Sequence, residues 1–190
     1  MDDLVRRAIT APDRVWNRAE VLARPCPVPP VAGIYGWYFK ELPCRTDTSG
    51  CLHFGDLTLL YVGISPKAPP TNGARPSRQT IRNRIRYHFR STAYGSTLRL
   101  TLGTELGMPL RLGGSGGLTF GEGEARLSAW MSENAFVTWV VCPEPWVAEH
   151  EFISELDLPL NLDGNRRHPH WPELSRLRRE SKAAARGLGT

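Results

Sequence analysis

Two tyrosines lie beside glycines in apolar runs, where a phenol next to an open backbone could handle the proton of a bound water. The runs are VAGIYGWYF, from Val31 to Phe39, and LLYVGIS, from Leu59 to Ser65. Their β-branched and aromatic residues predict strands over 34–39 and 57–64. Alternation then places Tyr35 with Gly33 and Trp37 on one face of the first strand, and Tyr61 with Leu59 and Gly63 on one face of the second. The two tyrosines are either ordinary packing residues or parts of an active site.

An arginine and a histidine share one margin of a predicted basic helix over residues 80–90. At about 100° per residue, its apolar side chains form one stripe: Ile81, Ile85 and Phe89. Arg84 and His88, four residues apart, lie together at the edge of this stripe. Arg82, Arg86 and Arg90 fall on the other side. This is either a phosphate-binding cation beside a proton-transferring imidazole or a basic surface helix with a histidine at the core edge.

Glu149 is the third unusual residue, because it points inward from a predicted helix over 146–157. The apolar side chains of that helix span one arc: Trp146, Phe152, Ile153 and Leu156. Glu149 falls in the middle of this arc, whereas the neighbouring glutamates point away from it. A carboxylate drawn toward a core needs a hydrogen-bonding partner, a cation or a metal to offset desolvation. We therefore expect a functional carboxylate or half of a structural ion pair, with Arg84 as the candidate partner.

The remaining segments predict the elements that position these residues. The N-terminal segment LVRRAITAPDRVWNRAEVLAR predicts two helices, the second starting near Asp13, and the prolines of PCPVPPV end it in a strap. Ser77 is the expected N-cap of the basic helix. Downstream we expect a helix closed by Gly107, an exposed glycine-rich loop, and then helix, strand and helix to residue 157. A final basic helix is expected from about Pro172 to Arg186.

Composition favours a polyanionic partner. The chain has 190 residues and a formal charge of +5, and six arginines but no acid lie between Arg75 and Arg90. Its four cysteines lack the close pairs of a zinc site. No run approaches the roughly 20 apolar residues that span a bilayer, and nothing resembles a signal peptide. We expect a cytoplasmic protein with no membrane partner.

Taken in order, these residues resemble the GIY-YIG nuclease family, which is named for two tripeptides on adjacent strands. The tripeptides here are Gly33-Ile34-Tyr35 and Tyr61-Val62-Gly63. The likeness continues through Arg84, His88 one turn later, and Glu149, and it ends at Asn161 in LPLN. The chain departs from the compact family core in its long loop between the tripeptides and in an insertion over 91–135.

The resemblance implies an α+β fold with a small antiparallel sheet of about three strands flanked by helices. The expected divisions are an N-terminal helical extension and strap over 1–30, a nuclease domain over 31–162 and a basic helical extension over 163–190. The implied activity is metal-dependent hydrolysis of DNA phosphodiesters, with one active site per chain. A dimer would permit double-strand cleavage, although the sequence does not fix the oligomeric state.

The resemblance also implies a role for each site residue. Glu149 would hold Mg²⁺ or Mn²⁺, Arg84 would bind the phosphate, and Asn161 would brace the site. Tyr35, Tyr61 and His88 stay open as candidates for activating the water, and a phenol would need Arg84 or the metal to lower its pKa. The expected DNA-backbone residues are Lys67, Arg82, Arg86, Arg90, Arg166, Arg167 and Arg176 to Arg179. The alternative function is a non-catalytic nucleic-acid-binding protein that keeps the fold.

Overall fold

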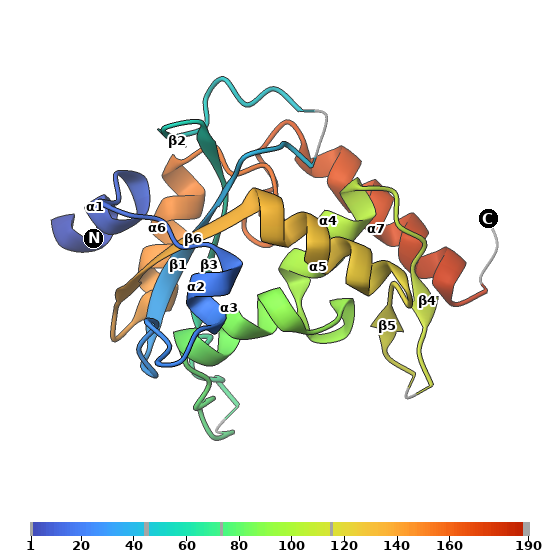
Figure 1. Ribbon diagram of the computed structural model, residues 1–190, viewed down its shortest axis with the longest axis horizontal. Coiled ribbons are helices and arrows are strands. Elements are labelled where there is room, and N and C mark those ends of the chain that lie inside the picture. Colours follow the sequence, from blue (N-terminus) through green and yellow to red (C-terminus); the bar gives the residue numbers. More distant parts are fainter. Residues whose placement is uncertain (1, 44–45, 73, 115, 188–190) are drawn as a thin grey trace.

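A four-stranded antiparallel sheet with helices on both faces forms the centre of the protein (Figure 1). The computed structural model describes residues 2–43, 46–72, 74–114 and 116–187. The strands lie in the order β2-β3-β1-β6. Their bounds are Gly33–Phe39 for β1, His53–Phe54 for β2, Leu57–Ser65 for β3 and Ala135–Val141 for β6. The α+β class is confirmed, and the short β2 adds a fourth strand to the three expected.

The alternation of β1 divides the interior into two hydrophobic cores. Tyr35, Trp37 and Phe39 face the first core, while Ile34 and Tyr38 face the second. The first core is covered by α2 (Arg18–Leu22), α3 (Ile81–Arg90), α4 (Thr97–Glu105) and α5 (Gly123–Asn134). The second is covered by α1 (Asp3–Thr10) and α6 (Pro145–Glu155). The last helix, α7 (Trp171–Ala185), packs against α4.

A β-bulge corrects the expected alternation of β3. Trp37 pairs with Tyr61, but Tyr38 pairs with Leu59, so Leu60 is an additional residue on β3. One extra residue reverses the faces on either side of it. Leu59 therefore lies in the second core, whereas Leu60 and Tyr61 both lie in the first. The expectation that Leu59 shares a face with Tyr61 is wrong for this reason.

The second N-terminal helix begins later than Asp13, the expected start. Asn17 caps α2 by accepting a hydrogen bond from the Glu20 backbone N–H at 3.0 Å, and the Glu20 carboxylate accepts one from the Asn17 N–H at 2.8 Å. This reciprocal pair satisfies two backbone donors at the helix start. Just before it, Trp16 and Val137 exchange backbone hydrogen bonds of 2.9 Å. The chain is held against β6 there, so it cannot be helical from Asp13.

The basic helix α3 also starts after the expected cap. Thr80 is its N-cap, and its hydroxyl accepts a hydrogen bond from the Asn83 N–H at 3.3 Å. Ser77 lies three residues upstream in the loop, where its hydroxyl accepts from the Gln79 N–H. A threonine hydroxyl caps a helix as a serine hydroxyl does, so residue type alone does not distinguish Ser77 from Thr80 as the N-cap. The helix itself and its apolar stripe are confirmed.

The insertion over 91–135 is built into the first core. It contains the 3-10 turn η1 (Ala93–Gly95), α4, a hairpin of β4 (Arg111–Leu112) and β5 (Leu118–Thr119), and α5. Gly107 follows α4 with φ of 66°, as a C-terminal glycine does. Two short strands that the sequence did not predict pair around the glycine-rich segment, and the glycines form the loop between them; Gly114 and Gly116 are exposed, as expected. Arg99 is fully buried and pairs with Glu124 at 2.7 Å, which joins α4 to α5.

Among the helices that the structure describes, none combines the length and apolar character needed to cross a bilayer.

Candidate active site

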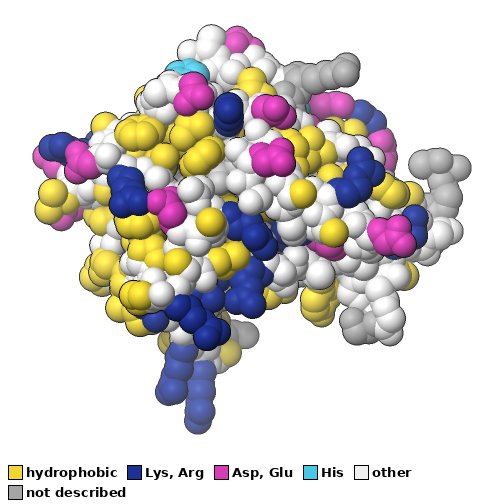
Figure 2. Space-filling view, in the orientation of Figure 1, with side chains coloured by type: hydrophobic (Ala, Val, Ile, Leu, Met, Phe, Trp, Pro, Cys, Tyr) yellow, Lys and Arg dark blue, Asp and Glu magenta, His cyan; other side chains and the backbone are white. Residues whose placement is uncertain are grey.

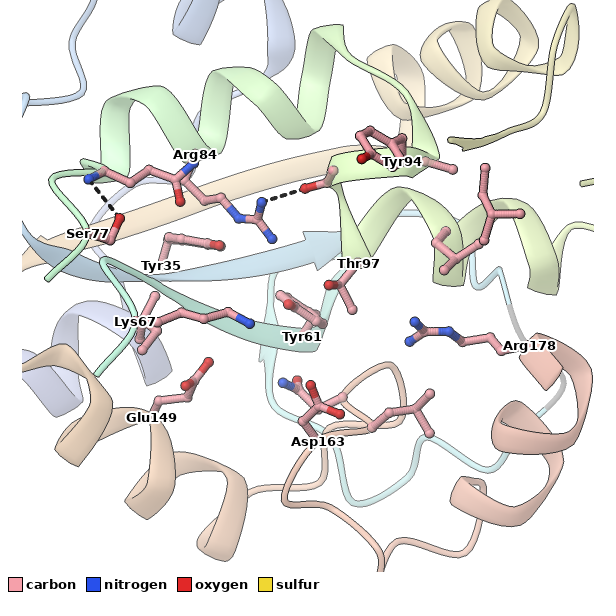
Figure 3. A pocket seen from close by; sticks show the side chains of 18 of the residues that line it. Tyr35, Tyr61, Lys67, Ser77, Arg84, Tyr94, Thr97, Glu149, Asp163 and Arg178 are labelled. Atoms are coloured by element: carbon pink, nitrogen blue, oxygen red, sulfur yellow. Dashed lines mark hydrogen bonds between the residues drawn. The ribbon is translucent and has the colours of Figure 1, made fainter. Parts of the chain in front are cut away.

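A pocket of about 910 Å³ lies where β1, β3, α3 and α6 meet (Figure 3). Its lining includes six side chains singled out from the sequence: Tyr35, Tyr61, Lys67, Arg84, Glu149 and Asn161. Tyr35 and Asn161 are 126 positions apart along the chain, and the fold brings all six residues to one concave surface. Among the predicted catalytic residues, His88 is the exception, because it does not line the pocket.

Gly63 makes room for the phenol of Tyr35. The two residues are directly paired between β1 and β3. A Cβ atom at position 63 would lie 2.8 Å from the Tyr35 hydroxyl and 2.9 Å from its ring. A Cβ at Gly33 would collide with the Val140 carbonyl of β6. Both predicted structural glycines therefore stand where backbone or ring atoms approach too closely for a side chain.

We expect Gly63→Ala to displace the Tyr35 ring from the pocket. Overpacking of this kind costs about 1–3 kcal/mol of folding stability, which urea unfolding would measure. Gly114→Ala is the matched control, because a Cβ there meets nothing within 4 Å. We expect the control to change the free energy of unfolding by less than about 0.5 kcal/mol. Equal stability of the two variants would contradict the close packing of Tyr35 on Gly63.

His88 lies behind Tyr35 and is fully buried. Its Nε2 is 3.0 Å from the Tyr35 hydroxyl, and its Nδ1 is 2.7 Å from the Ser96 hydroxyl, which comes from the insertion. Burial, reinforced by the charges of Arg84 and Arg99, holds the pKa of His88 well below its usual range. The imidazole is therefore neutral and joins Tyr35 to Ser96 in one hydrogen-bonded row.

Both phenols in the pocket are protonated at neutral pH. Burial raises the pKa of Tyr35 far above 10 and that of Tyr61 to about 12, and the Glu149 carboxylate adds to both increases. Arg84 opposes the increases, but its effect is smaller than that of burial. From the sequence we expect Arg84 or a metal to lower the pKa of the phenol that activates the water. Arg84 alone does not lower it below the ordinary value. With Arg84 as the cation that acts on them most strongly, both phenols are neutral at neutral pH, and Tyr35 can accept a proton only as it gives up its own.

Arg84 is anchored at one end and open at the other. Its Nη1 donates a hydrogen bond of 2.7 Å to the Gly95 carbonyl of η1, and the rest of the guanidinium faces the pocket (Figure 3). Within the described part of the chain, Arg84 forms no ion pair with Glu149, so the structural pairing considered from sequence is not formed. The free edge of the guanidinium is placed to bind an anion.

Glu149 is a half-buried carboxylate on the opposite wall. Burial raises its pKa to about 7, and the negative charge of Asp163 adds to the increase, whereas Lys67 and Arg84 oppose it. The described residues contain no group of three His, Cys, Asp or Glu side chains arranged to hold a metal. Mg²⁺, however, is commonly held by one or two carboxylates together with waters and substrate phosphates. Glu149, with Asp163 lining the same pocket, fits that open mode of binding.

Asn161 pairs with the edge of β3 that extends beyond its pairing with β2. Its Oδ1 accepts a hydrogen bond from the Val62 N–H at 2.9 Å, and its Nδ2 donates to the Val62 carbonyl at 2.8 Å. Next to it, the Leu160 N–H donates to the Leu60 carbonyl at 3.1 Å. The segment supplies the bonds that a neighbouring strand would make. It thereby fixes the backbone on both sides of Tyr61.

A family model described as the GIY-YIG catalytic domain matches residues 33–180. The chain belongs to the GIY-YIG nuclease family. Comparisons with curated proteins and with solved structures found no match. The matched range starts at the first tripeptide and extends into α7, so it includes the insertion and the start of the final helix.

Most of the basic residues expected on DNA lie outside the pocket of this GIY-YIG domain. Figure 2 shows Lys and Arg side chains gathered down the middle of one face, over α2 and α3 and the loop before α3. In α3, Arg86 is half-buried and Arg90 is exposed. Arg82 donates to the Val28 carbonyl at 2.6 Å, which holds the proline-rich strap against the helix. This band is separate from the pocket, whose only predicted DNA-backbone lysine is Lys67.

Of the C-terminal arginines expected on DNA, some lie outside the pocket and one lines it. Arg166 lies over the Trp171 ring at 5.8 Å, and Arg167 donates to the Ile153 carbonyl at 3.0 Å. Neither lines the pocket, but Arg178 does. Sequence reasoning had included Arg178 only as part of a basic run. It missed five further residues of the site: Tyr94, Ser96, Asp163, Lys182 and Arg186. For Lys182 in α7 and Arg186 at its C-cap, the signal in the sequence was that Arg178, Lys182 and Arg186 follow one another at four-residue intervals.

Proposed function

We propose that this GIY-YIG domain is a metal-dependent DNA endonuclease that hydrolyses phosphodiester bonds, with one active site per chain. The supporting observation is that Tyr35, Arg84 and Glu149 approach one pocket from three different elements (Figure 3). A cation for phosphate, a phenol for water and a carboxylate for a metal are the groups that the reaction requires. A protein that only binds nucleic acid has no physical need for a half-buried carboxylate.

Arg84 binds the scissile phosphate in this proposal. Its bond to Gly95 fixes the guanidinium, and its remaining N–H groups meet the nonbridging oxygens, where negative charge increases during attack. Asn161 and Gly63 act indirectly, since they hold Tyr61 and Tyr35 in place. Tyr61 stays neutral and offers its hydroxyl as a hydrogen-bond donor or acceptor in the pocket.

Tyr35 and His88 take the proton of the attacking water. The water passes its proton to the Tyr35 oxygen while the Tyr35 proton moves to His88 Nε2, 3.0 Å away. His88 Nδ1–H then donates to the Ser96 hydroxyl, which fixes the tautomer. The low pKa of His88 makes an imidazolium costly, and the negative charge of the bound phosphate offsets that cost. The P–O3′ bond breaks, leaving a 5′ phosphate and a 3′ oxygen that takes a proton from bulk water to become the 3′ hydroxyl. His88 then returns its proton to solvent through Tyr35, which restores the neutral pair.

Glu149 is the residue that would hold Mg²⁺ or Mn²⁺, with Asp163 lining the same pocket. A divalent cation bound there would offset charge on the phosphate and on the departing 3′ oxygen. The ionised form of Glu149 is required for this, and a bound cation favours ionisation.

A cleavage assay on supercoiled plasmid tests the proposal. We expect nicked circles to appear in Mg²⁺ or Mn²⁺ and not in EDTA, because one site cuts one strand at a time. Conversion to linear DNA would follow as a second event or through a dimer. Branched and linear DNA are assayed in parallel. If no DNA form is cut with either metal, the endonuclease proposal is wrong and the non-catalytic binder replaces it.

A further inference from the structure

Helix α7 carries basic residues on two faces, and only one of these faces has ion pairs among the described residues. Arg176 bonds Glu173 at 2.7 Å and Glu180 at 2.6 Å, so its charge is offset on the helix surface. Another face turns toward the pocket and carries Arg178 and Lys182, and Arg186 follows four residues later at the C-cap of the helix. None of these three forms an ion pair within the described residues. The face toward the pocket therefore lacks ion pairs among the described residues, and Asp163 is the acidic residue whose charge acts on it.

These pocket-facing cations are poorly satisfied by the protein. Arg178 Nε is buried without a hydrogen-bond partner among the described residues, and its Nη1 makes only a 3.3 Å bond to the Thr101 hydroxyl. Burial lowers the pKa of both Arg178 and Lys182, and the charges of Arg178 and Arg186 lower that of Lys182 further. Asp163 offsets part of the repulsion. A bound anion would relieve both the crowded charge and the missing acceptor.

Tyr94 stands at the rim of the same pocket and is 73% exposed. A Cβ at Gly117 would lie 2.6 Å from the Tyr94 ring, so the ring rests on the backbone of the β4–β5 hairpin. Tyr94 also precedes Gly95, whose carbonyl anchors Arg84. The insertion thus presents a supported aromatic ring one residue from the group that holds the phosphate-binding arginine. Figure 3 shows Arg178 reaching into the pocket from the α7 side.

We propose that the part of the pocket between Tyr94 and α7 binds an unpaired nucleotide next to the scissile phosphodiester. Its base stacks on Tyr94, and the adjoining phosphates bind the pocket-facing cations of α7. The substrate class is then DNA with a single-stranded segment at the point of cleavage. This inference rests on the proposed function, because it takes the bound strand to be the one cut beside Arg84.

The preference for an unpaired nucleotide follows from stacking. In an intact duplex both faces of an internal base are covered by its neighbours, so a tyrosine can stack only on a base that has left the helix. A phosphate site alone would bind duplex and single strand alike, since backbone contacts carry no such information. The supported ring of Tyr94 beside unpaired cations is the combination found in single-strand sites.

The test measures binding, so that it does not depend on cleavage. Full-length Glu149→Gln protein in EDTA is titrated against a fluorescein-labelled blunt duplex and the same duplex with an unpaired thymidine tail, using anisotropy. We expect added Tyr94→Ala to weaken binding of the tailed duplex by roughly tenfold, with less than about a twofold change for the blunt one. Tyr94→Phe should retain binding, because it keeps the ring. Leu112→Ala is the control, since Leu112 is half-exposed on the same hairpin outside the pocket.

Salt dependence tests the α7 cations separately. Lys182→Ala should reduce the slope of log affinity against log salt for the tailed duplex by about 0.7, the value for one phosphate contact to a single strand. Arg7→Ala on α1, paired with Asp13 and distant from the pocket, removes the same charge and should leave the slope unchanged. Equal losses on both DNAs from Tyr94→Ala, or no loss on either, would overturn the inference. Wild-type protein that cuts no DNA would refute the nuclease proposal. The single-strand site would still be decided by the effect of Tyr94→Ala on binding of the two DNAs, which is measured in EDTA.

Discussion

Glu149→Gln is expected to reduce metal-dependent cleavage by roughly 10³-fold or more. Loss of the bound metal raises the free energy of the transition state by several kcal/mol, because the metal no longer stabilises its negative charge. The substitution keeps the size and shape of the side chain, replaces one carboxylate oxygen with an NH2 group and removes the ability to ionise. It therefore tests the charge rather than the shape of the residue. Single-turnover cleavage of supercoiled plasmid, at saturating protein and Mg²⁺, measures the loss without interference from product release.

The same substitution is expected to stabilise the metal-free protein near neutral pH. Burial raises the pKa of Glu149 to about 7 from an ordinary 4.5. As pH rises between these values, the unfolded chain releases its proton while the folded carboxyl retains it, so the free energy of unfolding falls. Above pH 7 the full cost is present, at most about 3 kcal/mol. Glutamine avoids it, so the variant's advantage should be absent near pH 4 and greatest near pH 8.

Glu144→Gln is the matched control for both measurements. Glu144 is exposed at the start of the same helix, and its side chain makes no capping hydrogen bond. The control should cleave DNA at nearly the wild-type rate and show no comparable pH-dependent gain in stability. A Glu149→Gln protein that cleaves as well as wild type would remove the carboxylate from the mechanism. Equal stability of wild type and Glu149→Gln near pH 8 in EDTA would instead show that the carboxylate is not strained by burial.

The predictable part of this site rests on local patterns. Strands around Tyr35 and Tyr61 follow from runs of β-branched and aromatic residues, and the inward direction of Glu149 follows from helical projection. Both patterns depend on a single element and its own period. The face of Leu59 could not be obtained this way, because the bulge at Leu60 arises from pairing with β1, and alternation within one strand does not show it.

The unpredicted part depends on contacts between distant segments. Ser96 meets His88 only because the insertion packs its α4 against the end of α3. The cations of α7 have helical spacing, but the face that meets the pocket is set by the preceding turn. Two buried histidines fix that turn: His168 bonds Asp157, and His170 bonds Glu105 of α4 at 2.7 Å. No local periodicity encodes such pairings, so the basic wall of the pocket required the fold.

Arg84→Ala is expected to lower single-turnover cleavage by about 10²–10³-fold, the usual effect of removing one donor that binds developing negative charge. Arg84→Lys should restore only a small part of the rate. Lysine keeps the charge, but it lacks the planar fork that can bond the Gly95 carbonyl and a phosphate at the same time. The cleavage rate of Arg84→Lys should therefore lie closer to that of Arg84→Ala than to that of wild type, because the planar geometry of the guanidinium matters more than its charge.

Arg86→Ala is the comparison that separates catalysis from attraction. Arg86 lies two residues along the same helix, half-buried and outside the pocket, within the basic band of α3. Its removal should weaken DNA binding, most strongly at low salt, and reduce the slope of log affinity against log salt by about 0.9, the value for one duplex contact. The cleavage rate at saturating protein should stay near wild type. Arg84→Ala should show the opposite pattern, because its loss persists at saturation. If both variants lose only affinity, Arg84 serves as one more backbone contact and the phosphate-binding role assigned to it is wrong.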